Sequence, residues 1–140
     1  MSELPDSFDY ALIRVVPRVE RGELINVGAI VACATKQFLA ATIALDPDRL
    51  RALDPTIDVA EIEAALASIP WIAAGDKRGG PIAALPRGER FHWLVAPRSA
   101  VIQTSPVHTG ICSDPAAALA ELIAKLVRTP QTGDYLGGVE

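Results

Sequence analysis

The segment between residues 98 and 108 holds the side chains best suited to bind an anion or to move a proton. Arg98 can hold a carboxylate or phosphate through two parallel hydrogen bonds, and the imidazole of His108 is a group that can accept or donate a proton. Gln103 and Ser105 add further hydrogen-bonding groups. The segment therefore predicts a small anion-binding surface. Turn-forming residues surround these side chains, so a structural role for His108 stays open beside the functional one.

A nucleophilic serine would be the route from this surface to covalent catalysis. Ser99 or Ser105 would need a base within hydrogen-bond reach and an acid that orients the base. His108 and Asp114 are the groups available for these roles, but the spacing does not show that they approach either serine. No nucleophile-elbow sequence is present. The sequence favours a protein that is not an enzyme, with a hydrolase as the alternative.

Arg14 could add positive charge to the same surface. It shares one face of an expected strand with apolar side chains, where a buried guanidinium requires a partner. Glu20 and Glu23 are the expected partners, in which case Arg14 is structural. If Arg14 converges instead with Arg98 and His108, the sheet carries a pocket for a small anionic ligand.

Metal and cofactor sites are not indicated. The two histidines, His92 and His108, are expected on separate elements, and Cys33 and Cys112 are isolated from one another and from any ligand pattern. The sequence has no phosphate-binding glycine motif. We expect no cofactor, no metal and two reduced thiols.

Composition limits the classes of partner and compartment. The chain has 140 residues, of which half are hydrophobic, and a net charge of -4, so it lacks the positive field of a general nucleic-acid binder. Its apolar runs are too short to span a membrane, and its acidic N-terminus does not resemble a secretion signal. We expect a cytoplasmic protein that binds neither nucleic acid nor membrane.

The patterning predicts one α+β domain over residues 1–140. Its ordered core is expected over about residues 8–128, and a glycine-containing flexible tail over residues 131–140. The sheet should be largely antiparallel with about five strands, joined by two or three helices in the order βββ-α-α-β-β-α. The expected strands cover residues 8–16, 24–33, 38–45, 90–96 and 100–105.

Three aspartates mark the expected helix starts. Asp46 and Asp114 each precede a proline, which suits the first helical position, and Asp58 has the spacing of a capping box with Glu61. Residues 75–88, rich in glycine and proline, are expected to form a mobile loop. Gly28, inside the second strand, predicts a bulge or a close approach to the backbone.

Two stretches carry a family resemblance. Residues 10–28 (YALIRVVPRVERGELINVG) and 90–110 (RFHWLVAPRSAVIQTSPVHTG) look like the bacterial family catalogued as domain of unknown function 3037, and the likeness extends over about residues 8–128. The resemblance brings no activity and no catalytic residues. It implies a HipA-like kinase as partner, because members of the family are expected to be encoded beside one. The expected function is a non-enzymatic interaction or regulatory protein, with a small-molecule or phosphate-binding domain as the alternative.

Overall fold

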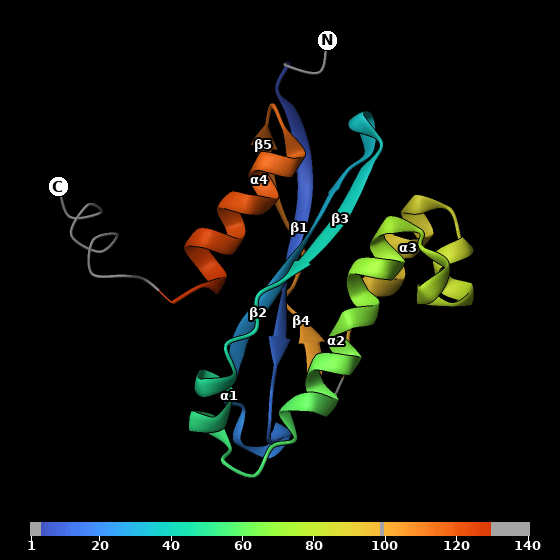
Figure 1. Cartoon of the computed structure of the whole chain (residues 1–140). Coiled ribbons are helices and arrows are strands. Elements are labelled where there is room, and N and C mark those ends of the chain that lie inside the picture. The colour runs from blue at the N-terminus through green and yellow to red at the C-terminus, as the bar shows by residue number, and fades with distance from the viewer. Residues whose placement is uncertain (1–3, 99, 130–140) are drawn as a thin grey trace, which may run out of the picture.

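A five-stranded sheet with helices on both faces forms the core of the protein. The computed structural model describes residues 4–98 and 100–129. The strands are β1 (Asp6–Val15), β2 (Ile25–Cys33), β3 (Phe38–Ile43), β4 (Ile102–Thr104) and β5 (His108–Cys112). The helices are α1 (Pro47–Leu53), α2 (Val59–Ala74), α3 (Arg87–Leu94) and α4 (Pro115–Leu122) (Figure 1). The predicted α+β class is confirmed, with one helix more than expected.

All strand pairs of the sheet are antiparallel. The order is β3-β2-β1, and both β4 and β5 pair with the remaining side of β1. β5 lies beside the first half of β1 and β4 beside its end, where Ile13 faces Thr104. β4 and β5 therefore act as one interrupted edge strand of the sheet.

Gly28 lies beside a β-bulge, as its position in the strand predicts. The β1–β2 register shifts between Ile13 and Arg14, and Gly28 pairs with Ile13 on one side and Ile43 on the other. A Cβ atom at Gly28 would lie 2.5 Å from the carbonyl oxygen of Thr42. The close approach is made by the neighbouring strand rather than by a ligand.

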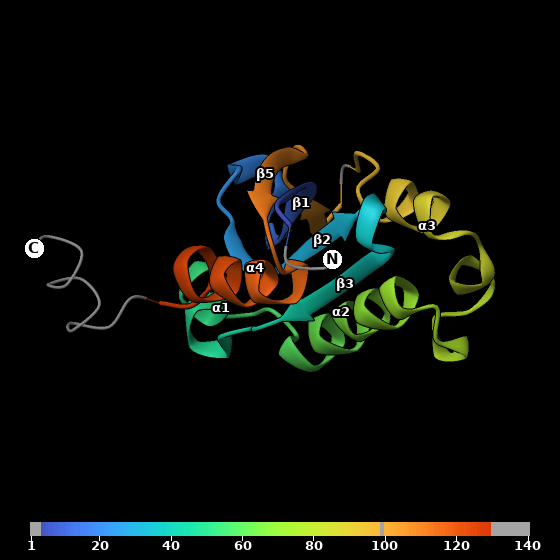
Figure 2. The ribbon, with the colours of Figure 1, turned by 90° about the horizontal axis from the view of Figure 1, so that it is seen from above.

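Each face of the sheet carries its own hydrophobic core. On one face, α2 and α3 contribute buried side chains that include Leu66 and Phe91. On the other, α4 and its continuation bury Leu119, Ile123 and Val127. Figure 2 shows α2 and α4 on opposite sides of the sheet. The fold thus has three layers, although the helical layers differ in extent.

The predicted helix starts are confirmed. The carboxylates of Asp46, Asp58 and Asp114 each accept a backbone N–H of the first turn, so they satisfy donors that the helix leaves free. α4 continues into a π-helical turn, Ile123–Val127. The predicted tail at residues 131–140 lies outside the described residues.

The predicted strand over residues 90–96 is wrong, because this segment belongs to α3. Phe91 and Leu94, three positions apart, are both buried against the core, whereas Trp93 is partly exposed. Three-residue spacing is helical, and the alternation of apolar residues that suggested a strand is coincidental. Arg90 fixes the helix to its surroundings by donating to the carbonyl oxygens of Leu85 and Ala73.

The predicted loop at residues 75–88 is largely folded. It contains two 3₁₀ turns, Lys77–Gly79 and Pro81–Ala84, and includes the start of α3. Ala83 is buried, and a Cβ atom at Gly79 would lie 2.9 Å from the side chain of Ile72 in α2. The glycine permits close packing on α2 rather than an open loop.

The edge strand differs from its predicted limits. Only Ile102–Thr104 of the expected strand at residues 100–105 forms β4, and the expected turn near His108 instead begins β5. Pro106 has no N–H to contribute to a ladder, so pairing stops there and resumes one residue out of register.

Within residues 4–98 and 100–129, no helix is long and apolar enough to cross a membrane.

Candidate functional site

Ser105 is a structural residue in this fold. It is buried, with 3% of its surface exposed. Its Oγ accepts the backbone N–H of Leu12 at 2.9 Å and donates to the carbonyl oxygen of Pro106 at 2.9 Å. These bonds replace ladder bonds at the break between β4 and β5. The hydroxyl is thus occupied, and the other serine considered, Ser99, lies outside the described residues.

Arg14 has a different partner from the ones expected. Its Nε donates to Oδ1 of Asn26 at 3.4 Å, and Asn26 in turn donates to the carbonyl oxygen of Leu126 at 3.1 Å. Glu23 pairs with Arg21 instead, at 2.6 Å. The expected pairing with Glu20 or Glu23 is wrong because the bulge brings Asn26 directly opposite Arg14. We call α4 and its π-helical turn, residues 115–127, the α4 segment. The Arg14–Asn26 pair links β1 and β2 to the end of this segment.

Arg98 and Gln103 make local contacts. The Arg98 guanidinium lies 4.4 Å from the ring centroid of Trp93 and donates to the Trp93 carbonyl oxygen at 2.7 Å. Gln103 donates to the carbonyl oxygen of Ala100 at 2.7 Å. Arg98 therefore packs on the C-terminal end of α3, and α3 in turn packs against α2.

His108 is exposed at the start of β5. It pairs with Tyr10, and the two ring centroids are 5.4 Å apart. Gln103 pairs with Arg14, four residues further along β1, or roughly 13 Å away at the usual strand rise. None of the five predicted residues lines the hollows beside α4, beside α1 or at the start of α2. The structure distributes them over β1, the β4–β5 edge and the end of α3.

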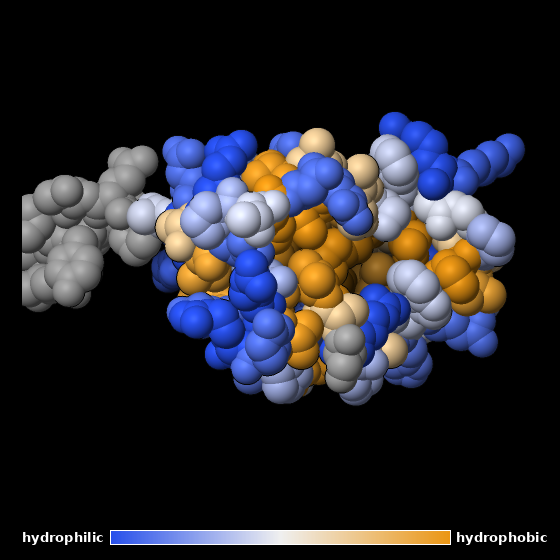
Figure 3. Space-filling model, turned by 90° about the horizontal axis from the view of Figure 1, so that it is seen from below, coloured by the Kyte–Doolittle hydropathy of each residue, from blue (hydrophilic) through white to orange (hydrophobic). Residues whose placement is uncertain are grey.

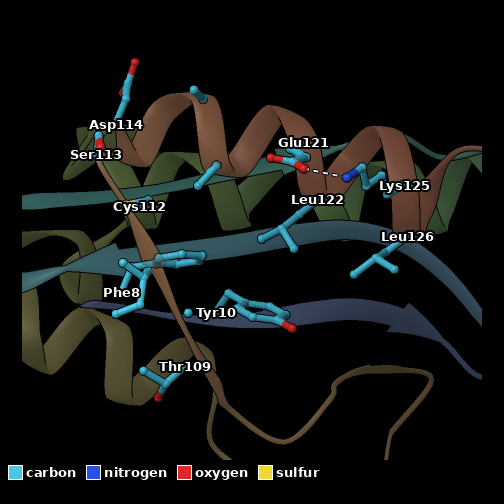
Figure 4. A pocket seen from close by; sticks show the side chains of 14 residues that line it. Phe8, Tyr10, Thr109, Cys112, Ser113, Asp114, Glu121, Leu122, Lys125 and Leu126 are labelled. Atoms are coloured by element: carbon cyan, nitrogen blue, oxygen red, sulfur yellow. Dashed lines mark hydrogen bonds and ion pairs between the residues drawn. The ribbon is translucent and has the colours of Figure 1, made fainter. Parts of the chain in front are cut away.

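A groove that the sequence did not indicate runs between β5 and α4, across the start of β1. We call it the β5–α4 groove, and its volume is about 580 Å³. Phe8 and Tyr10 lie in it, while Leu122 and Leu126 reach toward it from the α4 segment (Figure 4). Asp114, Glu121 and Lys125 are charged lining residues. The groove is open to solvent and mainly apolar.

Gly110 has no side chain, which leaves room for the Phe8 ring in the groove. The two residues are paired across β1 and β5, and a Cβ atom at Gly110 would lie 2.8 Å from the ring. Phe8 is buried in the core beneath α4 and could not easily move away. A strand glycine here allows an aromatic ring to cover the backbone.

The groove exists because α4 stands away from the sheet edge. The α4 segment packs on β2 and β3, not over β5. Tyr10, which β1 directs toward α4, therefore stays partly uncovered. Two sequence signals could have indicated this: Gly110 within an expected edge region, and an apolar stripe on α4 wider than one strand pair needs.

Two ionisable groups that line the groove have shifted pKa values. Lys125 bonds to Glu121 at 2.6 Å, and this hydrogen bond and its charge lower the pKa of the Glu121 carboxyl. Burial raises the pKa of the Cys112 thiol, so it is held in its neutral, weakly nucleophilic form. Cys112 and Cys33 are both free thiols.

A second hollow opens where β1 ends and α2 begins. Its volume is about 410 Å³, and its walls include Pro17, Ile57, Ile62 and Ile102. Figure 3 shows apolar residues gathered in the middle of this lower end of the molecule. Asp58 also lines it, but its carboxylate is occupied as the cap of α2. Over the described part of the chain, no cluster of three potential metal ligands occurs.

The fold and the groove define the protein as an α+β domain with an open apolar groove beside an edge strand. The chain belongs to the family described as Protein of unknown function (DUF3037), whose model matches residues 10–127. The match covers β2 to β5, the four helices and residues 10–15 of β1, so it includes both walls of the groove. No curated protein and no solved structure matches the chain.

Proposed function

We propose that this protein is a non-enzymatic interaction or regulatory module that binds a partner protein through the β5–α4 groove. The observation that carries the proposal is the groove itself: an open channel of about 580 Å³ with aromatic and aliphatic walls. The apolar side chains gather in one open groove, whereas singly scattered exposed apolar residues would need no explanation. The charged groups at its border give the polar rim that is typical of protein interfaces.

A HipA-like kinase is the proposed partner, and the protein is proposed to act in the bacterial cytoplasm. The support for this partner is the family, whose members are expected to be encoded beside such a kinase. The groove supports the physical side of the proposal, because the half-buried Tyr10 and the exposed Leu126 are side chains of the kind that anchor a docked partner.

Co-expression with the neighbouring HipA-like kinase and size-exclusion chromatography test the proposal. We expect the two chains to elute together at micromolar concentration. Leu126→Asp should weaken the complex at least about tenfold, because the partly exposed Leu126 lines the groove. Ala124→Asp is the matched control: it is exposed on the same helical segment, outside the described cavities, and should bind normally.

Separate elution of the unmodified chains would rule out the kinase as a stable partner. Equal loss of binding in Leu126→Asp and Ala124→Asp would show that the groove is not the contact surface.

A small-molecule-binding function is the second candidate, and the groove volume favours it. Ligand sites usually enclose about 300–1,000 Å³ with mainly apolar walls and a few polar groups. Tyr10, Thr109 and Lys125 would supply the polar groups. Thermal unfolding with an apolar dye and with inorganic phosphate distinguishes an apolar ligand site from an anion site. Stabilisation by the dye would support an apolar ligand in the groove, whereas stabilisation by phosphate alone would favour the anion-binding alternative.

A further inference from the structure

We infer that β5 pairs with β5 of a second copy of this chain, so that two sheets join into one across a two-fold axis. Among the described residues, β5 pairs only with β1, so its outer edge is unpaired. Three of its five residues are exposed, and Ile111 has 72% of its surface exposed. This inference is independent of the kinase proposal.

The direction of the backbone groups follows from the neighbouring residues of β1. Leu12 donates its N–H to Oγ of Ser105 and accepts the Ser105 N–H at 2.8 Å, so its backbone groups point toward β4 and β5. Val16 points the same way, since its N–H bonds to Val101. In an antiparallel sheet, the backbone N–H and C=O groups of successive residues point to alternate sides of the strand. The backbone groups of the even-numbered residues of β1 therefore point toward β5.

The odd-numbered residues of β5 are therefore the ones available to a new strand. His108, Gly110 and Cys112 lie opposite even-numbered residues of β1, and their backbone groups are used within the sheet. The N–H and C=O groups of Thr109 and Ile111 point away from β1. These two residues present the hydrogen-bonding groups that an added strand would meet.

The pattern is complementary to itself. If Gly110 lies on the two-fold axis, Thr109 of one copy faces the partner's Ile111, and each pair exchanges two N–H···O bonds, roughly four in all. Gly110 has no Cβ, and the Phe8 ring already fills the adjacent space. Two Gly110 residues can thus approach at the short distance of a non-hydrogen-bonded pair, about 4.5 Å.

The side chains agree with this register. Ile111 lies on the face of β5 opposite Phe8 and Gly110, together with Thr109, whose Oγ1 donates to Asp9 at 3.0 Å. Pairing would place the exposed Ile111 beside the partner's Thr109, so part of its exposed surface would become buried. On the other face, the two β5–α4 grooves would lie next to each other across the axis.

The opposite edge of the sheet is less suited to pairing. None of the six residues of β3 is exposed, and β3 packs against α2 on one face and α4 on the other. β5 lacks the charged side chains and the proline that usually protect an edge strand from association. Pairing of β5 with β5 also closes the assembly at two copies, whereas pairing of β5 with β3 would extend without limit.

Sedimentation equilibrium on the full chain, over about 1–200 µM, tests the inference. We expect a monomer–dimer equilibrium for the unmodified protein. Ile111→Pro removes an outward N–H without removing a bond to β1, and should raise the dimer dissociation constant at least about tenfold. Ile111→Thr keeps the N–H and a β-branched side chain, and should change the constant by less than about fivefold.

Three results would overturn the inference: a monomer at every concentration, a mass that grows beyond the dimer, or an Ile111→Pro dimer as tight as the unmodified one. Amide hydrogen exchange of the unmodified protein gives the same test without a substitution. The Thr109 and Ile111 amides should gain protection as concentration rises, while the Gly110 and Cys112 amides stay protected throughout. Exchange of Thr109 and Ile111 that is independent of concentration would contradict the proposed pairing.

Discussion

The two faces of the sheet are covered to different extents. On one face, the 16 residues of α2, supported by α3 and two 3₁₀ turns, enclose a core in which Leu66 is fully buried. On the other, the shorter α4 segment packs on β2 and β3 and leaves the β5–α4 groove open. The first face is closed over its core, whereas the second leaves Tyr10 and Leu126 partly exposed at the groove. This difference is the basis on which we propose the groove as the interaction surface.

The largest expected effect is on the covered face. Leu66→Ala should lower the free energy of unfolding by about 2–5 kcal/mol, because it leaves a cavity in a closely packed core. Leu122→Ala, in the half-buried wall of the groove, should cost less than about 1.5 kcal/mol. Urea unfolding of both variants checks the difference. Equal losses would mean that the two faces are packed alike.

The next largest effect on stability is expected at Gly110, where β5 lies against the Phe8 ring in the groove. Gly110→Ala should destabilise the protein by about 1–3 kcal/mol, because its Cβ would lie 2.8 Å from the buried Phe8 ring. Gly88→Ala is the control: the space around Gly88 in α3 is open, so alanine there should stabilise by about 0.5–1 kcal/mol. Thermal unfolding measures both changes. A harmless Gly110→Ala would show that Phe8 does not depend on this glycine.

A smaller effect is expected where the groove is most exposed. Leu126→Ala should change the free energy of unfolding by no more than about 0.5 kcal/mol, since 43% of the Leu126 surface is exposed. The same urea titration provides the measurement. A loss above 2 kcal/mol, on the scale of a core leucine, would assign Leu126 to the core and remove it from the binding surface.

The smallest effect concerns acid stability at the far end of α2. Hydrogen bonds from Arg78 lower the pKa of Asp76 from an ordinary 3.8 to about 2. A lowered pKa stabilises the fold above the ordinary value, and this contribution is lost as the pH falls toward 2. Asp76→Asn should therefore be less stable than the unmodified protein above pH 4 and nearly equal to it near pH 2. Chemical unfolding at several pH values would show this convergence, and a constant difference would contradict it.

Much of the fold could be predicted because local chemistry specifies it. The caps at Asp46, Asp58 and Asp114 and the bulge at Gly28 depend on neighbours in sequence or in the adjacent strand. The segment containing Phe91 is a helix where a strand is expected, because strand-like alternation and helical three-residue spacing both fit so short a stretch. Only its packing against α2 decides between the two.

Gly110 and the apolar stripe of α4 are indirect signals of the groove, but its place could not be predicted because it depends on where α4 packs on the sheet. The chosen side chains, among them Arg98 and Ser105, have the right chemistry, but their partners are backbone carbonyls or amides brought close by the fold. Sequence shows which groups could bind a ligand. It does not show which of them the chain itself already satisfies.

Nuclear magnetic resonance of isotope-labelled protein, titrated with the HipA-like kinase, is the most direct test of the central claim. The account predicts that the amides around Phe8, Tyr10, Leu122 and Leu126, which line the groove, shift or broaden first. The amides of α2 and α3 should change little. Perturbations confined to the α2 and α3 face, with an unchanged groove, would contradict the assignment of the interaction surface.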